Sequence, residues 1–304
     1  MIESAGLIKV DLLGMGMLAV IRETLIILAD AFLAALINNQ PLGFYPSEVL
    51  INEAFRHGVR ILPVDVNRSF TRCTIETTDE QLAVRLRMVC VRGVSRNKSQ
   101  RIENARQSGF FTLIKDFMDR TQLDGMCIEH LILASVFDGL NLPRQALLWQ
   151  LWILEKWRGG YLLFEPDLTP PTLPKLKAFD WLDREYKAQG FSLPSHPIAL
   201  LRPQLSSKVR RSNVLKTLRD TTPVRVAGMV ICMQRPPTAK GVAFLLLEDE
   251  VGLINVVISP SVYEQYRAVF RLAPFVCVWG TLQRRDGVIH IQAQVFQRVE
   301  SNRL

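Results

Sequence analysis

The chain has 304 residues, of which 48% are hydrophobic and 22% are charged, with a formal net charge of +8. This composition excludes an intrinsically disordered chain and is sufficient for two compact units joined by connecting segments. Its five cysteines are scattered and form no Cys-x-x-Cys pair, so we expect no zinc site and no disulfide framework, and we predict a cytoplasmic location.

The N-terminal 40 residues are apolar but do not have the pattern of a membrane anchor. The run over residues 12–21 is separated from the run over residues 25–37 by Arg22 and Glu23, and Asp30 interrupts the second run. Neither run reaches the roughly 20 residues that a membrane span requires. We therefore expect core-facing segments. An acidic start, Met1-Ile2-Glu3, also argues against a secretory signal.

The next segments predict a helix, a strand and then a mainly helical region. A helix is expected over residues 47–57, capped by Ser47 and stopped by Gly58, with a strand over residues 59–64. Within residues 81–160, an apolar stretch meets a glycine turn at Gly93, and Ser95 is placed to cap a helix through about Gln107. Two further helices are expected over residues 111–120 and 126–137.

This glycine turn is typical of the second half of a helix-hairpin-helix, in which backbone N–H groups and a helix N-terminus bind one phosphate. The candidate contact residues of the turn are Arg92, Gly93, Ser95, Arg96 and Lys98. An ordinary structural turn before a helix has the same pattern, so both interpretations stay open.

A proline-rich segment over residues 165–174 predicts a linker, followed by a helix near residues 175–189 and a basic stretch. That stretch carries six cationic side chains and no acid: Arg202, Lys208, Arg210, Arg211, Lys216 and Arg219. It fits either a polyanion-binding segment or a solvated basic linker.

Residues 224–299 alternate as expected for a small closed β-barrel. Val224, Val226, Gly228, Val230 and Cys232 are predicted to share one face of the first strand. Strands over residues 242–247 and 253–258, a helix over residues 260–271, and a hairpin of residues 275–282 and 288–296 across Asp286-Gly287 follow. Three strands, a helix and two strands is the order of an OB-fold, which often binds single-stranded nucleic acid.

Binding to this barrel would combine a stacking aromatic with cationic loops. Phe244 is the stacking candidate, although alternation alone does not exclude a core position for it. The candidate phosphate contacts are Arg235, Lys240, Arg284 and Arg285.

Several ordered motifs resemble one known family, the bacterial error-prone DNA polymerase III alpha subunit, a damage-inducible C-family polymerase. They are the residues at 31–45, 56–59, 63–69, 91–94, 190–192 with 196–197, and 234–241. The resemblance runs from Asp30 onward and concerns the C-terminal part of that subunit. It implies a remnant of the fingers, a helix-hairpin-helix region for duplex DNA and an OB-fold for the template strand.

The palm is where the chain departs from the family. Residues 6–14 resemble the palm segment that carries the third metal-binding carboxylate, matched by Asp11, but the chain contains no Asp-x-Asp motif for the other two. Two-metal phosphoryl transfer needs several converging carboxylates. In the family most of the fingers lie between the palm segment and the stretch matched at Ala31, but here only some fifteen residues separate Gly16 from Ala31. The resemblance therefore implies an internally deleted, N-terminally truncated relative. We expect it to bind no metal and not to be catalytic alone, whereas the complete family enzyme uses Mg²⁺.

The expected class is thus α+β, a helix-hairpin-helix region followed by a C-terminal five-stranded OB-fold barrel. We expect a palm-end remnant over residues 1–28, a fingers remnant over 29–80 and tandem helix-hairpin-helix modules over 81–164. A linker, helix and basic stretch over residues 165–220 precede the barrel at 221–300.

The function expected from the resemblance is binding of single-stranded and duplex DNA in translesion synthesis and DNA repair. The family also implies a mutasome partner related to lesion-bypass polymerases and, through it, the sliding clamp. Two alternatives stay open. The barrel and the helix bearing Trp149, Trp152 and Trp157 could instead dock a protein partner, or a palm could be supplied in trans.

Overall fold

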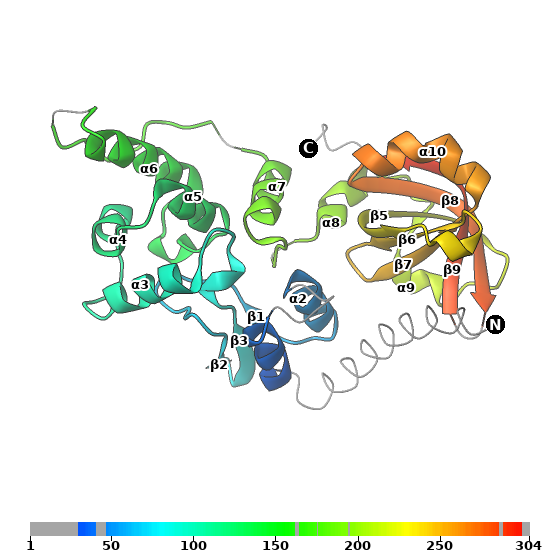
Figure 1. Cartoon of the computed structure of the whole chain (residues 1–304), viewed down its shortest axis with the longest axis horizontal. Coiled ribbons are helices and arrows are strands. Elements are labelled where there is room, and N and C mark those ends of the chain that lie inside the picture. Colours follow the sequence, from blue (N-terminus) through cyan, green and yellow to red (C-terminus); the bar gives the residue numbers. More distant parts are fainter. Residues whose placement is uncertain are drawn as a thin grey trace. The chain divides into compact units, whose positions relative to one another are not determined.

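The computed structural model describes residues 30–40, 47–161, 164–174, 176–193, 195–285 and 288–299. Predictions for residues 1–29, among them the palm-like segment with Asp11, lie outside these residues. The chain divides into two compact units, one of Met1–Lys175 with Asp183–Phe191 and the other of Leu176–Leu182 with Ser192–Leu304 (Figure 1). The expected five-segment division remains a prediction.

The first unit is mostly helical and contains one small sheet. Residues 30–38 are helical. The helices that follow are α2 (Ser47–Arg56), α3 (Arg96–Arg106), α4 (Ile114–Thr121), α5 (Gly125–Leu133) and α6 (Arg144–Arg158), with short 3₁₀ turns at Met88–Cys90 and Asp138–Leu140. The sheet has the order β1 (Ile61–Leu62), β3 (Gln81–Arg85), β2 (Thr74–Thr78), in which β1 is parallel and β2 antiparallel to β3.

An aromatic cluster forms part of the core of this unit. The ring of Phe117 lies edge-on to Phe111 and to Phe137, with centroid distances of 5.0 and 4.9 Å, and all three side chains are fully buried. Edge-to-face contacts place the positive ring edge against the negative ring face. This cluster fixes α4 against the segments on either side of the α4–α5 hairpin.

Helix α7 (Ala178–Gln189) crosses the division between the units. The second unit then contains α8 (Pro197–Leu201), a 3₁₀ turn (Arg202–Gln204), β4 (Val209–Arg210) and α9 (Ser212–Leu215). Its barrel elements are β5 (Pro223–Gln234), a 3₁₀ turn (Pro237–Ala239), β6 (Ala243–Glu248), β7 (Leu253–Ile258), α10 (Pro260–Leu272), β8 (Phe275–Arg285) and β9 (Val288–Arg298).

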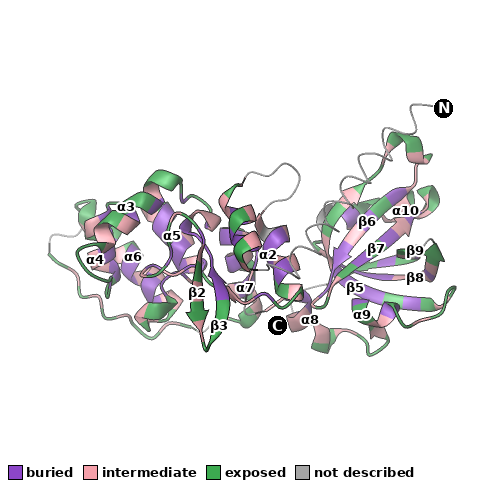
Figure 2. Cartoon of the chain, turned by 90° about the horizontal axis from the view of Figure 1, so that it is seen from below, coloured by how far each residue is buried: buried purple, intermediate pink, exposed green. Residues whose placement is uncertain are grey.

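The strands of this unit close into a five-stranded barrel. Their order is β5-β6-β7-β9-β8, and β5 also pairs with β8, while the two-residue β4 is added at the side of β5. Buried residues recur along the strands, and Figure 2 shows them in purple on β5, β6 and β7. Phe270 of α10 packs edge-on against Phe296 of β9, with centroids 4.7 Å apart. The helix therefore covers part of the barrel core.

Two irregularities bend the barrel strands. The β5–β6 register shifts between Val230 and Cys232, and beyond this bulge Met233 packs toward the core while Cys232 is exposed. The prediction that Cys232 shares the face of Val224 is therefore wrong, because an inserted residue reverses the alternation. A second shift lies at Gly280, where a Cβ atom would meet the Gln292 carbonyl oxygen at 2.3 Å.

The predicted class, helices followed by a five-stranded barrel, is confirmed. The third strand has the expected bounds, and Ser259 caps α10 ahead of Pro260. The strand expected over residues 59–64 contracts to the two paired residues of β1. In the part of the chain that the structure describes, no helix is both long and apolar enough to cross a membrane.

Candidate nucleic-acid interface

The glycine turn before α3 has the predicted cap. Gly93 has a φ of +80°, which favours glycine, and the Ser95 hydroxyl oxygen accepts a hydrogen bond from the Lys98 backbone N–H at 3.2 Å. Arg92 and Arg96 are exposed on either side of this cap. The turn therefore presents two cationic side chains beside the positive end of an eleven-residue helix.

A second hairpin lies between α4 and α5. Gln122 adopts a left-handed φ of +53°, and Asp124 caps α5 by accepting a hydrogen bond from the Cys127 backbone N–H at 2.9 Å. Arg101 of α3 donates to the carbonyl oxygens of Thr121 and Gln122, at 2.6 and 2.5 Å. Its guanidinium thus satisfies carbonyl groups at the C-terminal end of α4, where the helix leaves them without a partner.

The two hairpins are joined by Lys98, one of the predicted phosphate contacts. Its Nζ lies 2.6 Å from Oδ2 of Asp124. This hydrogen bond raises the pKa of Lys98 and lowers the pKa of Asp124. The pair brings the N-termini of α3 and α5 together, but it also neutralises the Lys98 charge. Arg92 and Arg96 are therefore the better placed cations at this surface.

Contacts with α5 also hold the first hairpin in place. His130 Nδ1 lies 3.0 Å from the Arg92 carbonyl oxygen, and a Cβ atom on Gly93 would lie 3.2 Å from the same ring nitrogen. Because a carbonyl oxygen only accepts, Nδ1 carries the proton in this contact. A side chain at position 93 would be strained by its φ and would also crowd His130.

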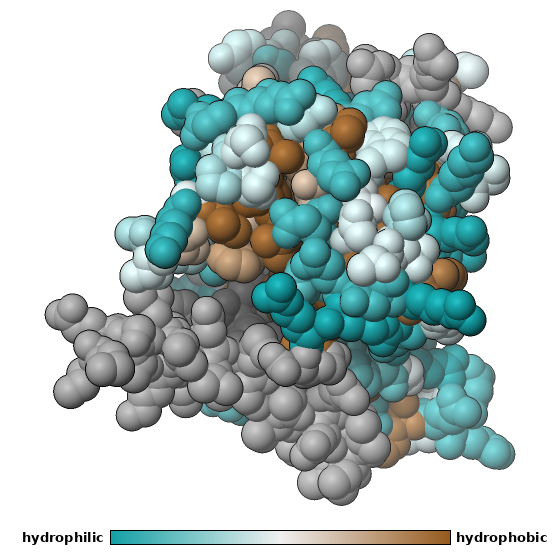
Figure 3. All heavy atoms as spheres, turned by 90° about the vertical axis from the view of Figure 1, so that its right-hand side faces the viewer, coloured by the Kyte–Doolittle hydropathy of each residue, from teal (hydrophilic) through white to brown (hydrophobic). Residues whose placement is uncertain are grey.

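On the barrel, Phe244 projects outward. Its residue is 44% exposed on β6, where it pairs with Gln234 of β5 and Val257 of β7. The core alternative for this ring is thereby excluded. Figure 3 shows one face of the molecule, on which hydrophilic side chains surround smaller hydrophobic areas. An aromatic ring exposed on a barrel strand is able to stack on a base.

The loop between β5 and β6 carries Arg235 and Lys240. Lys240 is exposed, with a left-handed φ of +49°. The Arg235 guanidinium carbon lies 4.4 Å from the Tyr263 ring centroid, and its Nη1 lies 3.3 Å from Oε1 of Glu264. Arg235 is thus partly engaged by α10, whereas Lys240 extends from the loop.

The two arginines at the end of β8 differ in their surroundings. Arg284 Nη2 donates to the carbonyl oxygens of Leu215, Lys216 and Leu218, at 3.4, 2.5 and 2.9 Å. This guanidinium holds the segment after α9 against the barrel. Arg285 is exposed at the last position of the strand. Both arginines are predicted phosphate contacts, but Arg284 is bound to these backbone carbonyl groups, whereas Arg285 is exposed at the strand end.

Two cations of the basic stretch are neutralised by the β6–β7 turn. Arg202 donates to both carboxylate oxygens of Glu250, at 2.9 and 2.6 Å, and Arg211 Nε donates to Oε1 of the same carboxylate at 2.7 Å. Asp249 accepts from the backbone N–H and the hydroxyl of Ser212, at 2.7 Å each. Arg202 and Arg211 therefore fasten the stretch to the barrel.

Within the described ranges, no group of three or more His, Cys, Asp or Glu side chains is placed to hold a metal ion. Sequence reasoning named Ser95 and Phe244 as candidates and did not name Arg101 or Asp124. An Asp-Gly pair before an apolar run is a helix-start signal that would have revealed the Asp124 cap. The pairing with Lys98 had no local signal.

Comparisons with known proteins match both of these regions. Residues 58–147 match the helix-hairpin-helix motif family, and residues 224–299 match the OB-fold nucleic acid binding domain family. The expected helix-hairpin-helix region and OB-fold are thereby confirmed. Of the solved structures, the asparaginyl-tRNA synthetase of Pyrococcus horikoshii aligns with 31% of this chain and 23% of its own, at 20% identity and a TM-score of 0.28.

The chain is also similar to curated proteins named error-prone DNA polymerase. That of Bdellovibrio bacteriovorus is 35% identical over 87% of this chain and 27% of its own length. That of Pseudomonas savastanoi pv. phaseolicola is 37% identical over 87% of this chain and 26% of its own. The chain thus spans about a quarter of the length of these relatives and matches their C-terminal portion.

Proposed function

Because this chain belongs to the error-prone DNA polymerase family, through the C-terminal portion of its members, we propose that it is a DNA-holding module of such a polymerase. The helix-hairpin-helix region would contact the duplex backbone, and the barrel would hold the single-stranded template. Such a role would operate in the cytoplasm, during DNA synthesis past damaged bases.

The observation that carries the proposal is the exposed Phe244 ring on an OB-fold strand, beside the loop that bears Lys240. Stacking of a base on an aromatic side chain contributes about 1–3 kcal/mol and tolerates any base. A nearby lysine adds attraction to phosphate that weakens with salt. This combination supports binding of a single strand without sequence preference.

For the duplex, support comes from the paired hairpins. The Ser95 and Asp124 caps place two helix N-termini on one surface, linked by the Lys98–Asp124 contact. N–H groups and dipoles at helix N-termini favour phosphate, and Arg92 and Arg96 add charge. Such contacts position DNA without reading its sequence.

The proposal assigns DNA holding, and not nucleotide addition, to this chain. Asp11 matches one of the three palm carboxylates, and the sequence has no Asp-x-Asp motif. Incorporation of nucleotides by the purified chain with Mg²⁺ would contradict this assignment.

Substitutions in the two units test the division of labour. Arg92→Ala with Arg96→Ala should weaken binding of a blunt duplex more than binding of a dT oligonucleotide. Phe244→Ala with Lys240→Ala should do the reverse. Fluorescence anisotropy with both labelled DNAs measures this, and Arg267→Ala, at an exposed position on α10, is the matched control. Equal losses on both DNAs for each pair of substitutions would contradict the division.

A second candidate function is docking of a protein partner, such as a mutasome component. It is favoured by large apolar side chains exposed in the second half of α6 and just beyond the helix: Trp152 at 58%, Tyr161 at 76% and Phe164 at 83%. Exposed apolar groups of this size often mark interaction sites. If docking is the main function, Trp152→Ala with Phe164→Ala should abolish capture of a lesion-bypass polymerase relative, and the purified chain should bind DNA poorly.

A further inference from the structure

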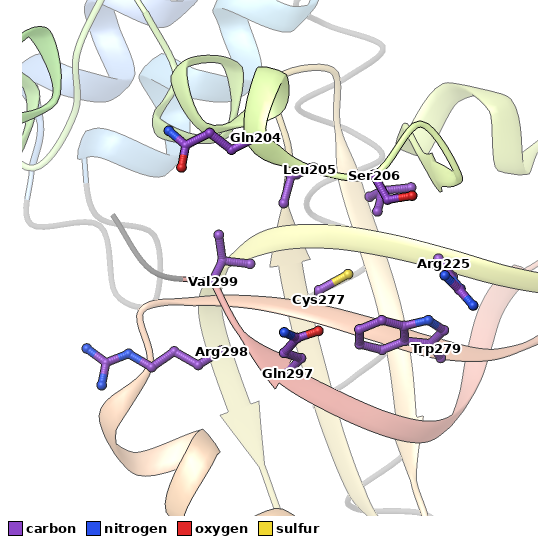
Figure 4. A pocket seen from close by; sticks show the side chains of 10 residues that line it. Gln204, Leu205, Ser206, Arg225, Cys277, Trp279, Gln297, Arg298 and Val299 are labelled. Carbon is purple, nitrogen blue, oxygen red and sulfur yellow. The ribbon is translucent and has the colours of Figure 1, made fainter. Parts of the chain in front are cut away.

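A cavity of about 440 Å³ lies in the C-terminal unit, at the outer side of the β5–β8 pair (Figure 4). The residues over 204–209 form one wall, and the strands β5, β8 and the end of β9 form the others. Ligand pockets for small molecules have volumes of roughly 300–1,000 Å³. The cavity is therefore large enough for a small ligand with one ring system.

One side of this cavity is formed by Arg225 and Trp279. They are register partners on β5 and β8, and the Arg225 guanidinium carbon lies 5.4 Å from the Trp279 ring. Arg225 is exposed and Trp279 is partly buried, and Figure 4 shows the two side chains next to each other. The site thus offers a flat aromatic surface with a positive charge beside it.

The other lining residues include four polar or cationic ones beside Leu205, Val209, Cys277 and Val299. Gln204 and Ser206 come from the wall over 204–209, and Gln297 and Arg298 come from the end of β9. Among the residues that the structure describes, no acidic side chain lines the cavity. The arrangement therefore suits a ligand that is anionic, planar in part and able to form hydrogen bonds.

The charges of this cavity are not neutralised as others in the unit are. Arg202, Arg211 and Arg235 each form an ion pair with a glutamate. Among the described residues, no carboxylate lies within ion-pair distance of Arg225 or Arg298. An anion would supply the partner that the Arg225 guanidinium lacks.

We propose that this cavity binds one nucleotide unit, with the base against Trp279 and the phosphate at the Arg225 guanidinium. Aromatic stacking and guanidinium–phosphate contacts are the two interactions that proteins use for nucleotides without regard to sequence. The unit could belong to a DNA strand or be a free nucleotide, since both present the same chemistry.

This site is separate from the surface of the proposed function. Phe244 lies on β6, which pairs with the second half of β5, from Met229 onward. Arg225 and Trp279 lie where the first half of β5 pairs with β8. A strand bound at both places would contact two faces of one barrel. The inference does not depend on Phe244.

The test uses the full chain labelled with 5-fluorotryptophan. Of the five tryptophans, Trp279 is assigned in the ¹⁹F spectrum by Trp279→Phe. We expect dAMP to shift the Trp279 resonance saturably while leaving the other four unchanged. Deoxyadenosine and inorganic phosphate should each act more weakly, because each provides one of the two interactions.

Variants then locate the phosphate contact. Arg225→Gln should weaken dAMP binding about tenfold, the equivalent of one charged hydrogen bond. Arg267→Gln, at the exposed α10 position, should leave it unchanged. Equal dAMP binding by the wild-type chain and Arg225→Gln would overturn the proposal.

A dA oligonucleotide distinguishes the sources of the nucleotide. A Trp279 shift with the oligonucleotide but not with dAMP would assign the site to a strand. A shift with both would show that the site accepts a free nucleotide as well as a strand. No shift with either would overturn the proposal. Failure of the proposed function has a different signature: the anisotropy assay would show no DNA binding while dAMP still shifts Trp279.

Discussion

Lys98 and Asp124 connect two helix N-termini, since the Nζ of one lies 2.6 Å from the Oδ2 of the other while Asp124 caps α5. The pair stabilises the hairpins against each other and removes one positive charge from the proposed duplex surface. The same contact therefore positions the two helices and lowers the positive charge available to DNA. A substitution at Asp124 can separate these two effects.

Asp124→Asn should increase affinity for duplex DNA. Asparagine caps helices about as well as aspartate, so α5 should persist, while the Lys98 charge becomes available to phosphate. One added phosphate contact should steepen the dependence of log K on log salt by about one unit. Duplex titrations at several salt concentrations measure this slope. An unchanged slope, with Lys98→Ala also without effect, would remove Lys98 from the interface.

Arg284 and Arg285 should behave differently although they are neighbours. Arg284→Ala removes hydrogen bonds to three carbonyl oxygens and should lower the free energy of unfolding by about 1–2 kcal/mol. Arg285→Ala should leave stability unchanged, weaken binding of a single strand and flatten the salt slope by about one unit. Urea denaturation and anisotropy give the two readouts. Identical effects of the two substitutions would contradict the assigned roles.

Phe244→Ala should weaken binding of single-stranded DNA by about 1–3 kcal/mol, the contribution of one stacked base. Stability should change little, because the ring is 44% exposed. Leu253→Ala is the matched control, since Leu253 of β7 is 42% exposed and offers no ring. Comparable losses of DNA affinity in both variants would contradict stacking on Phe244 and would indicate a general change of the barrel surface.

The Arg202–Glu250 contact should make the C-terminal unit sensitive to acid. Burial acts to raise the pKa of Glu250, but hydrogen bonds from Arg202 and Arg211 outweigh it and hold the pKa below its ordinary value of 4.5. The contribution of this carboxylate to stability is therefore fully present above pH 4.5 and is lost as the pH falls through the folded-state pKa.

Glu250→Gln should consequently lower stability at neutral pH. The difference from the wild-type chain should shrink as the pH falls below 4.5, because the wild-type carboxylate then becomes neutral as well. Urea denaturation across this range, followed through the ¹⁹F signal of Trp279, measures the difference. A constant difference at every pH would show that the charge of Glu250 is not the stabilising feature.

The barrel was predictable because its signals are local. Ser259-Pro260 marks the start of α10, and period-two alternation gave the bounds of β7. Cys232 was misplaced because the bulge after Val230 has no marker in the sequence, such as a glycine. β1 was overestimated because only two residues of that apolar run find a partner strand.

The candidate site was only partly predictable, because some of its contacts join residues that are far apart in the sequence. The Ser95 cap rests on residues three apart, and it appears as expected. The partners of Lys98 and Arg284 lie 26 and up to 69 residues away, so their engagement is set by the tertiary fold. Sequence reasoning found which cations are present, and the structure shows which of them are already engaged.

The central claim, that this chain holds DNA through charged and stacking contacts, is tested most directly by one titration. The purified wild-type chain is titrated with a labelled dT oligonucleotide and a labelled duplex at two salt concentrations. The account predicts binding of both DNAs, with affinity that falls steeply as salt rises. Absence of binding to either DNA at the lower salt concentration would contradict it.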